Sequence, residues 1–510
     1  MPDNIADHPL KKEITRPGCE STRGLAAPLG TAAAVTAGIA PDGGLYVPRS
    51  LPLLPWREWL DWDYGAVAAR VIRLLAPDLP ETGVAAAAAV YGDGRFGAGS
   101  PAPLREAGAL GVLELWHGPT AAFKDLALQA LPHLLTAAAA QAAAGREILI
   151  LTATSGDTGK AALEGFRDVP GASVCVFYPD GGVSAVQEKQ MLTTGGNNTF
   201  VVGVRGNFDV CQKAVKTLFT TKWLRETLAE RGVLFSSANS INWGRLLPQI
   251  VYYIWSYLEA VRQNRVKAGA PVNFAVPTGN FGNILAGWYA RRVGLPVGRL
   301  LCASNRNNVL ADFFRGGVYD VNREFFRTES PSMDILVSSN FERLLFELGG
   351  RDGEKIRRLY ADLREKGRFQ VEESVLKACQ AVFAGGWTDE DACRAVIRRV
   401  WREWRYLLDP HTAIAWGVAE DHRATSGDET YTIVISTASP FKFAPAVLAA
   451  LTEAPAPADP WAALAELEQV TEWPAPQALR GLETREERRE ALLAPEEIAA
   501  WVSGKFAPPF

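Results

Sequence analysis

Short apolar, β-branched runs alternate with amphipathic helical patterns along most of the chain. Each run ends in small, hydroxylated or glycine residues, after which apolar positions recur with helical spacing. The strands expected from this pattern are residues 113–116, 148–152, 174–178, 200–204, 272–277, 299–303 and 432–436. Regular alternation of strand and helix is typical of parallel sheets covered by helices, so the pattern predicts an α/β protein.

The same pattern divides the 510 residues into four regions. We expect polar, frayed chain over 1–17, helices over 64–76 and 82–91, a charged helical insert over 351–407, and a solvated helical face over 483–490. The predicted regions are an N-terminal α+β region (1–105), a first α/β lobe (106–245), a second α/β lobe (246–450) and a C-terminal helical extension (451–510).

Composition excludes several classes of function. The net charge of -4 and the pI near 5.9 argue against a broad surface for nucleic acid. No apolar run is long enough to span a bilayer, and the N-terminus lacks the basic-then-apolar pattern of a signal peptide. The six cysteines and five histidines show no spacing typical of metal ligands or of a disulfide scaffold. We expect a cytoplasmic monomer without a metal site, whose cysteines are buried as small hydrophobic residues.

A strand, a glycine turn and a helix follow one another at residues 148–163 and again at 272–290. This geometry directs unpaired backbone N–H groups and the positive end of a helix toward one point, which favours an anion. For the first turn, residues 152–161 (TATSGDTGKA), a plain helix N-cap is the alternative. A nucleotide P-loop does not fit, because Thr154 replaces the leading glycine and Ala161 replaces the hydroxyl that would bind magnesium.

The second turn is residues 277–283 (PTGNFGN), in which two glycines bracket Asn280 and Phe281. Glycine lets backbone N–H groups approach an anion closely, and the neighbouring polar side chains can add donors. The spacing does not match the dinucleotide-binding fingerprint. A tight strand-to-helix turn without a ligand is the alternative.

Lys124 is the candidate nucleophile of the chain. It lies in the segment 117–129 (HGPTAAFKDLALQ), among mostly small or apolar neighbours. A buried lysine has a lowered pKa and can form an imine, whereas an average lysine is a surface residue. We expect Asp125 to act as a helix cap or ion-pair partner, and His117 to be structural.

Three further polar segments lie where ligands could bind, although each could be an ordinary loop. Residues 236–245 (SSANSINWGR) follow a short strand and contain Arg245, whose guanidinium suits a phosphate or carboxylate. Residues 409–416 (DPHTAIAW) predict a helix start with Asp409 as cap and His411 as a local hydrogen-bonder. Residues 436–443 (STASPFKF) end an apolar strand with hydroxyl groups.

These segments together resemble the threonine synthase family, in particular its longer, fungal and enterobacterial-type branch. The resemblance extends in order from about residue 21 to about residue 443, whereas the chain after about 452 is not diagnostic. The segments that carry it are STRG (21–24), PDGGLYVP (41–48), HGPTAAFKDLALQ (117–129), TATSGDTGKAAL (152–163), SANSINWGRLLPQ (237–249), PTGNFGN (277–283), SNRNN (304–308), PSMDILVSSN (331–340), DPHTA (409–413) and STASPFKF (436–443).

The resemblance implies a fold and a cofactor. The fold would be that of type II pyridoxal-phosphate enzymes, similar to the tryptophan synthase β subunit, with two lobes of parallel or mixed sheet covered by helices. Lys124 would carry pyridoxal 5'-phosphate through a Schiff base, and Thr437 would face the pyridine nitrogen. The residues expected to hold the cofactor phosphate are Gly279, Asn280, Phe281 and Asn283. The residues expected to bind substrate are Ser155, Asp157 and Thr158 for its α-carboxylate, and Asn242, Arg245 and Lys442 for its phosphate.

The reaction implied by the resemblance converts O-phospho-L-homoserine and water into L-threonine and phosphate. Two alternatives stay open: a phospholyase or dehydratase that uses the same lysine to give a 2-oxo acid and ammonia, and a non-enzymatic or nucleotide-binding α/β protein. One residue departs from the family pattern, since Lys160 stands where the family more often has a small residue. We expect its side chain to point to solvent.

Overall fold

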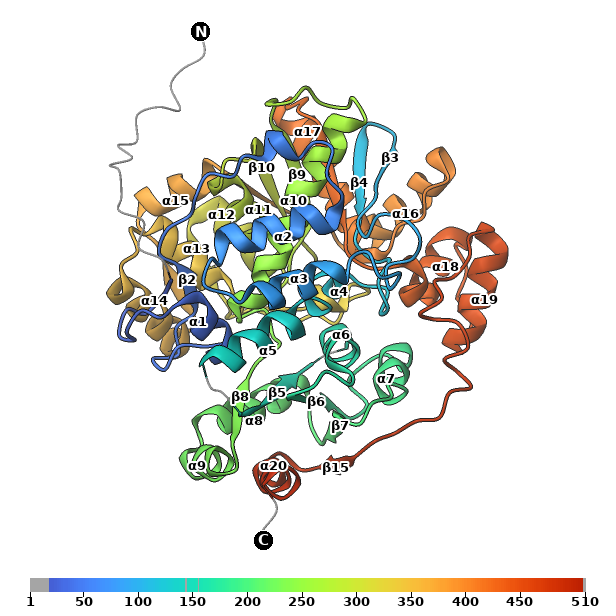
Figure 1. Ribbon diagram of the computed structural model, residues 1–510. Coiled ribbons are helices and arrows are strands. Elements are labelled where there is room, and N and C mark those ends of the chain that lie inside the picture. The colour runs from blue at the N-terminus through green and yellow to red at the C-terminus, as the bar shows by residue number, and fades with distance from the viewer. Residues whose placement is uncertain (1–17, 143–144, 155, 508–510) are drawn as a thin grey trace.

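The computed structural model describes residues 18–142, 145–154 and 156–507, and within this range the chain forms two sheet-based lobes and an N-terminal region (Figure 1). The N-terminal region pairs two short antiparallel strands and adds helices that pack on the larger lobe. Its predicted α+β character and both of its predicted helices are confirmed. Its elements are β1 (Cys19–Ser21), α1 (Thr31–Ala37), β2 (Tyr46–Pro48), η1 (Trp56–Trp59), α2 (Tyr64–Leu75) and α3 (Glu81–Ala89).

The smaller lobe is a five-stranded parallel sheet with strand order β15-β7-β6-β5-β8. Alternate residues of each strand face opposite sides, so Ile148 and Ile150 contribute to the central core while Leu149 and Leu151 pack under the outer helices. Helices α8, α9 and α20 cover that outer face (Figure 1). The elements are β5 (Glu147–Ala153), α6 (Asp157–Phe166), β6 (Ala172–Pro179), α7 (Ala185–Leu192), β7 (Thr199–Val204), α8 (Phe208–Thr220), α9 (Lys222–Glu230), β8 (Val233–Ser236), β15 (Ala491–Leu493), η4 (Pro495–Glu497) and α20 (Ile498–Phe506).

The larger lobe is a six-stranded mixed sheet, β13-β10-β9-β14-β4-β3, in which only the edge strand β3 runs antiparallel to its neighbour. Helices α16, α17 and α18 share one core with one face of the sheet, and α10 and α11 share another with the opposite face. The strands are β3 (Leu104–Ala107), β4 (Leu110–Glu114), β9 (Val272–Pro277), β10 (Val297–Ser304), β13 (Phe383–Trp387) and β14 (Thr432–Ser436).

The remaining elements surround the larger sheet or extend it toward the N-terminal region. They are α4 (Lys124–Leu128), α5 (Leu131–Ala142), α10 (Trp243–Arg262), α11 (Gly282–Arg292), α12 (Val309–Gly316), β11 (Val318–Asp320), η2 (Pro331–Met333), α13 (Phe341–Leu348), α14 (Gly353–Lys366), β12 (Arg368–Gln370), α15 (Glu373–Gln380), α16 (Glu390–Trp404), α17 (Pro410–Ser426), η3 (Pro440–Phe443), α18 (Ala444–Thr452) and α19 (Pro460–Thr471).

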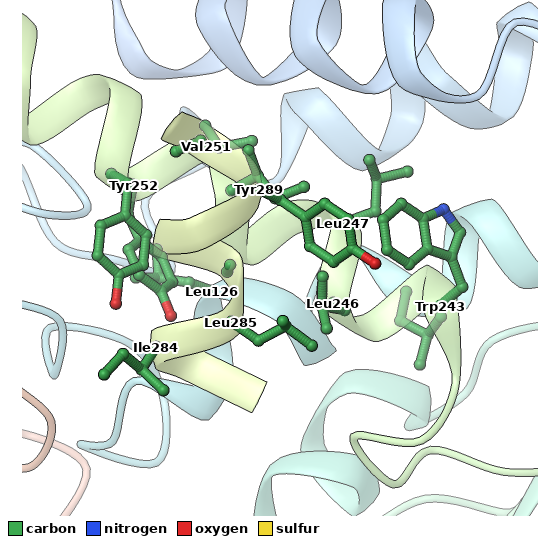
Figure 2. Close-up of a cluster of buried hydrophobic side chains, with 14 of the residues drawn as sticks. Leu126, Trp243, Leu246, Leu247, Val251, Tyr252, Ile284, Leu285 and Tyr289 are labelled. Carbon is green, nitrogen blue, oxygen red and sulfur yellow. The ribbon is translucent and has the colours of Figure 1, made fainter. Parts of the chain in front are cut away.

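The core between α10 and α11 also anchors the short helix α4. Figure 2 shows Leu126 of α4 among Leu246 and Leu247 of α10 and Leu285 of α11, all fully buried. Burying one such side chain contributes roughly 1.5–3 kcal/mol relative to leaving it in water. Because Leu126 lies two residues after Lys124, this core fixes the position of the candidate nucleophile.

The division into lobes differs from the predicted boundary at residue 106. Strand β4 pairs with β14, so the chain from β3 to α4, including Lys124, belongs to the larger lobe. The first-lobe prediction therefore holds only from β5 onward. Sequence order was misleading because strands that are adjacent in a sheet can be more than 300 residues apart in the chain.

Two further predictions need correction. The insert over 351–407 is not wholly helical, since it contains β13, whose Gly385 and Gly386 lie so close to Ala311 and Val418 that a Cβ would clash with them. The C-terminal extension is not a separate helical piece either, because β15 joins β7 and α20 packs on the smaller lobe. Residues 483–490 form turns and irregular chain, not a helical face.

All six cysteines are buried and unpaired, as predicted. Burial raises the pKa of all six thiols, that of Cys19 to about 12. None of the helices in the described ranges is long and apolar enough to cross a membrane.

Candidate active site

Lys124 is the first residue of α4 and lies where two central strands of the larger sheet end. The N–H of the preceding Phe123 donates to the carbonyl of Thr437, just after β14, at 2.8 Å. The lysine is 9% exposed, and its Nζ lies 3.3 Å from Oδ2 of Asp157 at the start of α6 in the smaller lobe. Burial lowers the pKa of Lys124; Asp157 opposes this, while the nearby cations Lys442 and Arg245 add to it. Lys124 thus lies between the two lobes, and its lowered pKa favours the neutral form of its amine.

Asp157 is held by groups from both lobes. Its Oδ1 accepts from Lys442 Nζ at 2.5 Å and from Gln187 Nε2 at 3.0 Å. Its Oδ2 accepts from Ser332 Oγ at 3.4 Å as well as from Lys124. Burial by itself would raise the pKa of this carboxyl, but Lys442 and Lys124 hold it well below its usual range. Asp157 therefore stays ionised and pairs with two lysines.

The second anion turn has the expected geometry at the start of α11. Phe281 precedes the helix in a left-handed conformation, φ 64°, and no side chain caps the helix. The first N–H groups of the helix have no intrahelical partner and are therefore available to an anion. A Cβ on Gly279 would lie 2.6 Å from the carbonyl oxygen of Ser332, so only glycine fits under that segment.

Asn283 adds a directed donor beside this helix start. Its Oδ1 accepts from the hydroxyls of Tyr252 and Tyr253, each at 2.8 Å, which fixes the orientation of the amide. Its buried Nδ2 has no hydrogen-bond partner among the described residues. An orphaned donor costs free energy unless a ligand satisfies it, so this turn fits a phosphorylated cofactor such as pyridoxal phosphate.

Asn280 and Phe281 lie in the same turn, and their role in holding the cofactor phosphate stays a prediction. The Phe281 ring packs in an aromatic core with Phe314, Phe341 and Phe383, so only its main chain can serve a ligand. The main chain of Asn280 is held by Asn340, whose Nδ2 donates to the Asn280 carbonyl at 3.0 Å.

Asn242 and Arg245 lie at the start of α10, near Lys124, but they are not equivalent. Both amide hydrogens of Asn242 are used on the carbonyls of Val35 and Ser237, and its Oδ1 caps the helix through Gly244. It has no donor left for a substrate phosphate, and that prediction is corrected: Asn242 positions the helix. Arg245 is buried without a carboxylate partner in the described part of the chain, and its Nε has no hydrogen-bond partner there.

The predicted carboxylate turn is described only in part. Ser155 lies outside the described residues, while the half-buried Thr158 is in the first turn of α6. Lys160 does not point to solvent as predicted; it is 6% exposed and its Nζ donates to Glu164 at 2.9 Å and to Thr194 at 2.8 Å. The prediction failed because a carboxylate one helical turn along the same face lets the lysine be buried as an ion pair.

The expected local role of His411 extends to the active site. Asp409 caps α17 and accepts from His411 Nδ1 at 2.8 Å, while His411 Nε2 accepts the backbone N–H of Ser332 at 3.2 Å. The imidazole is therefore neutral, with its proton on Nδ1. Ser332 and Gln187 were missed as site residues, and nothing in their local spacing indicated that they would meet Asp157.

Solved structures similar to this chain include two threonine synthases. The pyridoxal-phosphate-bound threonine synthase from Brucella melitensis is 36% identical, with a TM-score of 0.83 over 96% of this chain and 100% of that one. The yeast threonine synthase is 31% identical, with a TM-score of 0.84 over 96% and 99% of the two chains.

Sequence relatives agree with the structural ones. Human threonine synthase-like 1 is 40% identical over 434 residues, which are 82% of this chain and 57% of the relative. This chain therefore spans little more than half the length of that protein. The threonine synthase of Pseudomonas aeruginosa is 41% identical over 447 residues, covering 86% of this chain and 91% of the relative.

Three family models match successive parts of the chain. They are the threonine synthase N terminus (residues 20–87), the pyridoxal-phosphate-dependent enzyme family (97–437) and the threonine synthase C-terminal model (412–502). Together with the buried Lys124 and the uncapped start of α11, these matches establish the family. The chain belongs to the threonine synthase family of pyridoxal-phosphate-dependent enzymes.

Proposed function

We propose that the protein converts O-phospho-L-homoserine and water into L-threonine and phosphate. The observation that carries the proposal is the arrangement around Lys124: a buried amine pairs with Asp157 at the start of α6, and Asp157 also contacts Ser332, whose carbonyl lies against Gly279 in the turn before α11. The substrate has two anionic groups and the cofactor a third, so a site of this kind must hold three anions close to one amine.

Lys124 would bond to the cofactor, whose phosphate would lie at the start of α11 near Gly279 and Asn283. Bound pyridoxal phosphate supplies an electron sink that stabilises negative charge on carbon atoms adjacent to the substrate amine. The amine of Lys124 would take a proton from the substrate α-carbon, because its lowered pKa favours the neutral form. Thr437 would face the pyridine nitrogen with a neutral hydroxyl.

The substrate anions would be bound by the smaller-lobe turn and by Arg245. The start of α6, with Ser155 and Thr158, would take the α-carboxylate through the N–H groups that remain there, since Thr154 Oγ1 already accepts those of Gly156 and Gly159 at 3.0 and 2.9 Å. Arg245 is the best candidate for the phosphate, because a buried guanidinium without a carboxylate partner favours an anionic ligand. Lys442 is fully buried behind Asp157, so we assign it to holding that carboxylate.

The test is to measure threonine and phosphate release from O-phosphohomoserine with pyridoxal phosphate present. We expect stoichiometric threonine and phosphate from the wild type, and loss of both the visible cofactor absorbance and the activity in Lys124→Ala. The matched control is Lys222→Ala, whose side chain is 86% exposed on α9 and should change neither.

The same assay separates the competing reaction. A phospholyase would release phosphate together with 2-oxobutanoate and ammonia, since water would not be added at the β-carbon. Detection of 2-oxobutanoate without threonine would contradict the proposal while leaving the role of Lys124 intact. We further propose that the protein acts in the cytoplasm as a monomer; a mass of about 55.2 kDa by light scattering is the expected result for the monomer.

A further inference from the structure

A cavity outside the active site lies between the N-terminal region, α14 and the segment that precedes α13. Its volume is about 600 Å³. Aliphatic and aromatic side chains form part of its wall, and three arginines but only one acid contribute to it. The lining residues are Arg23, Asp42, Val321, Val337, Arg357, Tyr360, Ala361, Leu363 and Arg364.

The single acid of the wall does not neutralise these arginines. The Asp42 carboxylate accepts from Ser21 Oγ and from the backbone N–H groups of Gly44, Leu25 and Ala26, at 2.7–2.9 Å. Burial would raise the pKa of Asp42, but these hydrogen bonds lower it. With these four hydrogen bonds, the Asp42 carboxylate stabilises the local turns of the chain.

Arg357 is the cation with the least compensation. It is half-buried and hydrogen-bonds to the backbone carbonyl of Arg23, but it forms no ion pair with any residue in the described ranges. Arg23 beside it pairs with the buried Glu342, to whose two carboxylate oxygens its Nε and Nη2 donate at 3.2 Å. Two half-buried guanidinium groups thus lie side by side, and the carboxylate of Glu342 compensates the charge of Arg23 but not that of Arg357.

We propose that this cavity binds a small organic anion, with its carboxylate or phosphate group on Arg357 and Arg23 and its apolar part against Val321, Tyr360 and Leu363. Guanidinium groups bind carboxylates and phosphates through paired N–H donors, and partial burial strengthens such contacts. The half-apolar wall selects an anion with a hydrocarbon body over a bare inorganic ion.

Two hydrogen bonds from residues close in the chain to the cavity connect it to the cofactor-binding turn. Val337 in its wall is followed by Ser338, whose Oγ donates to the carbonyl of Gly279 at 2.8 Å. Glu342, the partner of Arg23, lies two residues after Asn340, which donates to the carbonyl of Asn280. An anion that binds Arg23 would compete with Glu342 and so act on the cofactor-binding turn through Asn340, as an effector.

Benzoate tests the binding site, because it combines a carboxylate with an apolar ring and lacks an amine that could react at the cofactor. Titration calorimetry on the holoenzyme is expected to show saturable binding of benzoate and none of uncharged benzamide. Arg357→Gln should weaken binding by about tenfold or more, the loss of a charge-assisted contact. Arg358→Gln, an exposed position next along α14, is the matched control and should bind like the wild type.

A second variant keeps the test independent of the charge change. Ala361→Phe fills the cavity without altering any arginine, and it should abolish benzoate binding while the cofactor spectrum persists. Benzoate should also shift the absorbance or emission of the bound cofactor in wild type but not in Arg357→Gln. Equal affinity in wild type, Arg357→Gln and Ala361→Phe, or no saturable binding at all, would overturn the site; saturation without a spectral shift would overturn the coupling.

Discussion

Asp157 shows how burial and charge compete at a single residue. Desolvation opposes ionisation of its carboxyl, yet Lys442 and Lys124 on either side keep it ionised. Burial lowers the pKa of Lys124, and Lys442 and Arg245 add to this, although Asp157 opposes it. Asp157 is thus the partner that stabilises the charged form of the Lys124 amine, while burial and the neighbouring cations favour the neutral form.

His411 is predicted to position Ser332 through its Nε2 acceptor. His411→Phe removes the acceptor and leaves the Ser332 N–H unpaired, whereas His411→Gln can still accept with its amide oxygen. A lost hydrogen bond of this kind costs about 1–3 kcal/mol. The Ser332 carbonyl lies over Gly279 in the turn before α11, so a shift of Ser332 would disturb that turn. We therefore expect the Kd of pyridoxal phosphate to rise about tenfold in His411→Phe.

The measurement is fluorescence titration of the apoenzyme with pyridoxal phosphate. His411→Gln should restore most of the affinity. If His411→Phe and His411→Gln were impaired equally, packing against Phe443 rather than the hydrogen bond would be the cause.

The buried carboxyl of Asp125 should make the free energy of unfolding depend on pH. Burial raises its pKa to about 6, although Thr120 donates to both of its oxygens. A raised carboxyl pKa means that the native state binds the proton more tightly than the unfolded state, whose pKa is near 3.8. The contribution of protonated Asp125 to the free energy of unfolding is therefore present below about pH 4 and is lost as the pH rises through about 6. Its size is on the order of 3 kcal/mol.

Urea unfolding between pH 4 and 7 measures this contribution. In Asp125→Asn the pH dependence across that window should flatten relative to wild type, because the titrating group is gone. An unchanged slope would mean that another buried group titrates there.

At the scale of elements, the two strand–turn–helix units are each proposed to bind an anion, but they are built differently. The start of α11 is covered by η2 and held by the segment that leads into α13. The start of α6 instead faces the lobe boundary, where Asp157 meets Lys124, Lys442 and Ser332.

Gly279→Ala is predicted to disturb the α11 turn specifically. The new methyl group would lie 2.6 Å from the Ser332 carbonyl, a backbone atom that cannot move without shifting η2. We expect at least about tenfold weaker binding of pyridoxal phosphate, a cost within the 1–3 kcal/mol typical of overpacking. Equilibrium dialysis against the cofactor measures the change.

The control is Gly316→Ala at the end of α12, where an added Cβ meets no atom within 4 Å. Its cofactor affinity should equal that of the wild type. Equal affinity of Gly279→Ala and Gly316→Ala would show that η2 yields easily, and would remove the argument for a rigid turn.

At the scale of the whole molecule, the chain crosses between the lobes several times. It begins in the N-terminal region, builds part of the larger sheet, forms the smaller lobe, returns to the larger sheet and ends on the smaller one (Figure 1). The C-terminal segment therefore ties α19 of the larger lobe to β15 and α20 of the smaller.

Removal of residues 490–510 is predicted to loosen the smaller lobe. It strips β15 from β7 and uncovers the apolar face that Ile498 and Val502 bury. We expect proteases to cut the smaller lobe rapidly while the larger lobe stays resistant. Limited digestion with mass spectrometry of the fragments measures this difference. The milder variant Ile498→Ala should cost about 2–5 kcal/mol of stability.

Truncation of residues 508–510 alone is the control and should leave the digestion pattern unchanged. A 490–510 deletion that resists protease as well as the wild type would contradict the structural role of the tail.

The sequence by itself determined the α/β class, seven strands of the two large sheets to within a few residues, Lys124 as the candidate nucleophile and the glycine turn before α11. Those features depend on local periodicity and on residues near one another in the chain, such as the run that forms β14. Tertiary structure alone decided that Lys124 belongs to the larger lobe, that Lys160 is buried, and that Gln187, Ser332 and Lys442 converge on Asp157. Burial and long-range pairing depend on which surfaces meet when the chain folds, and no local pattern specifies that.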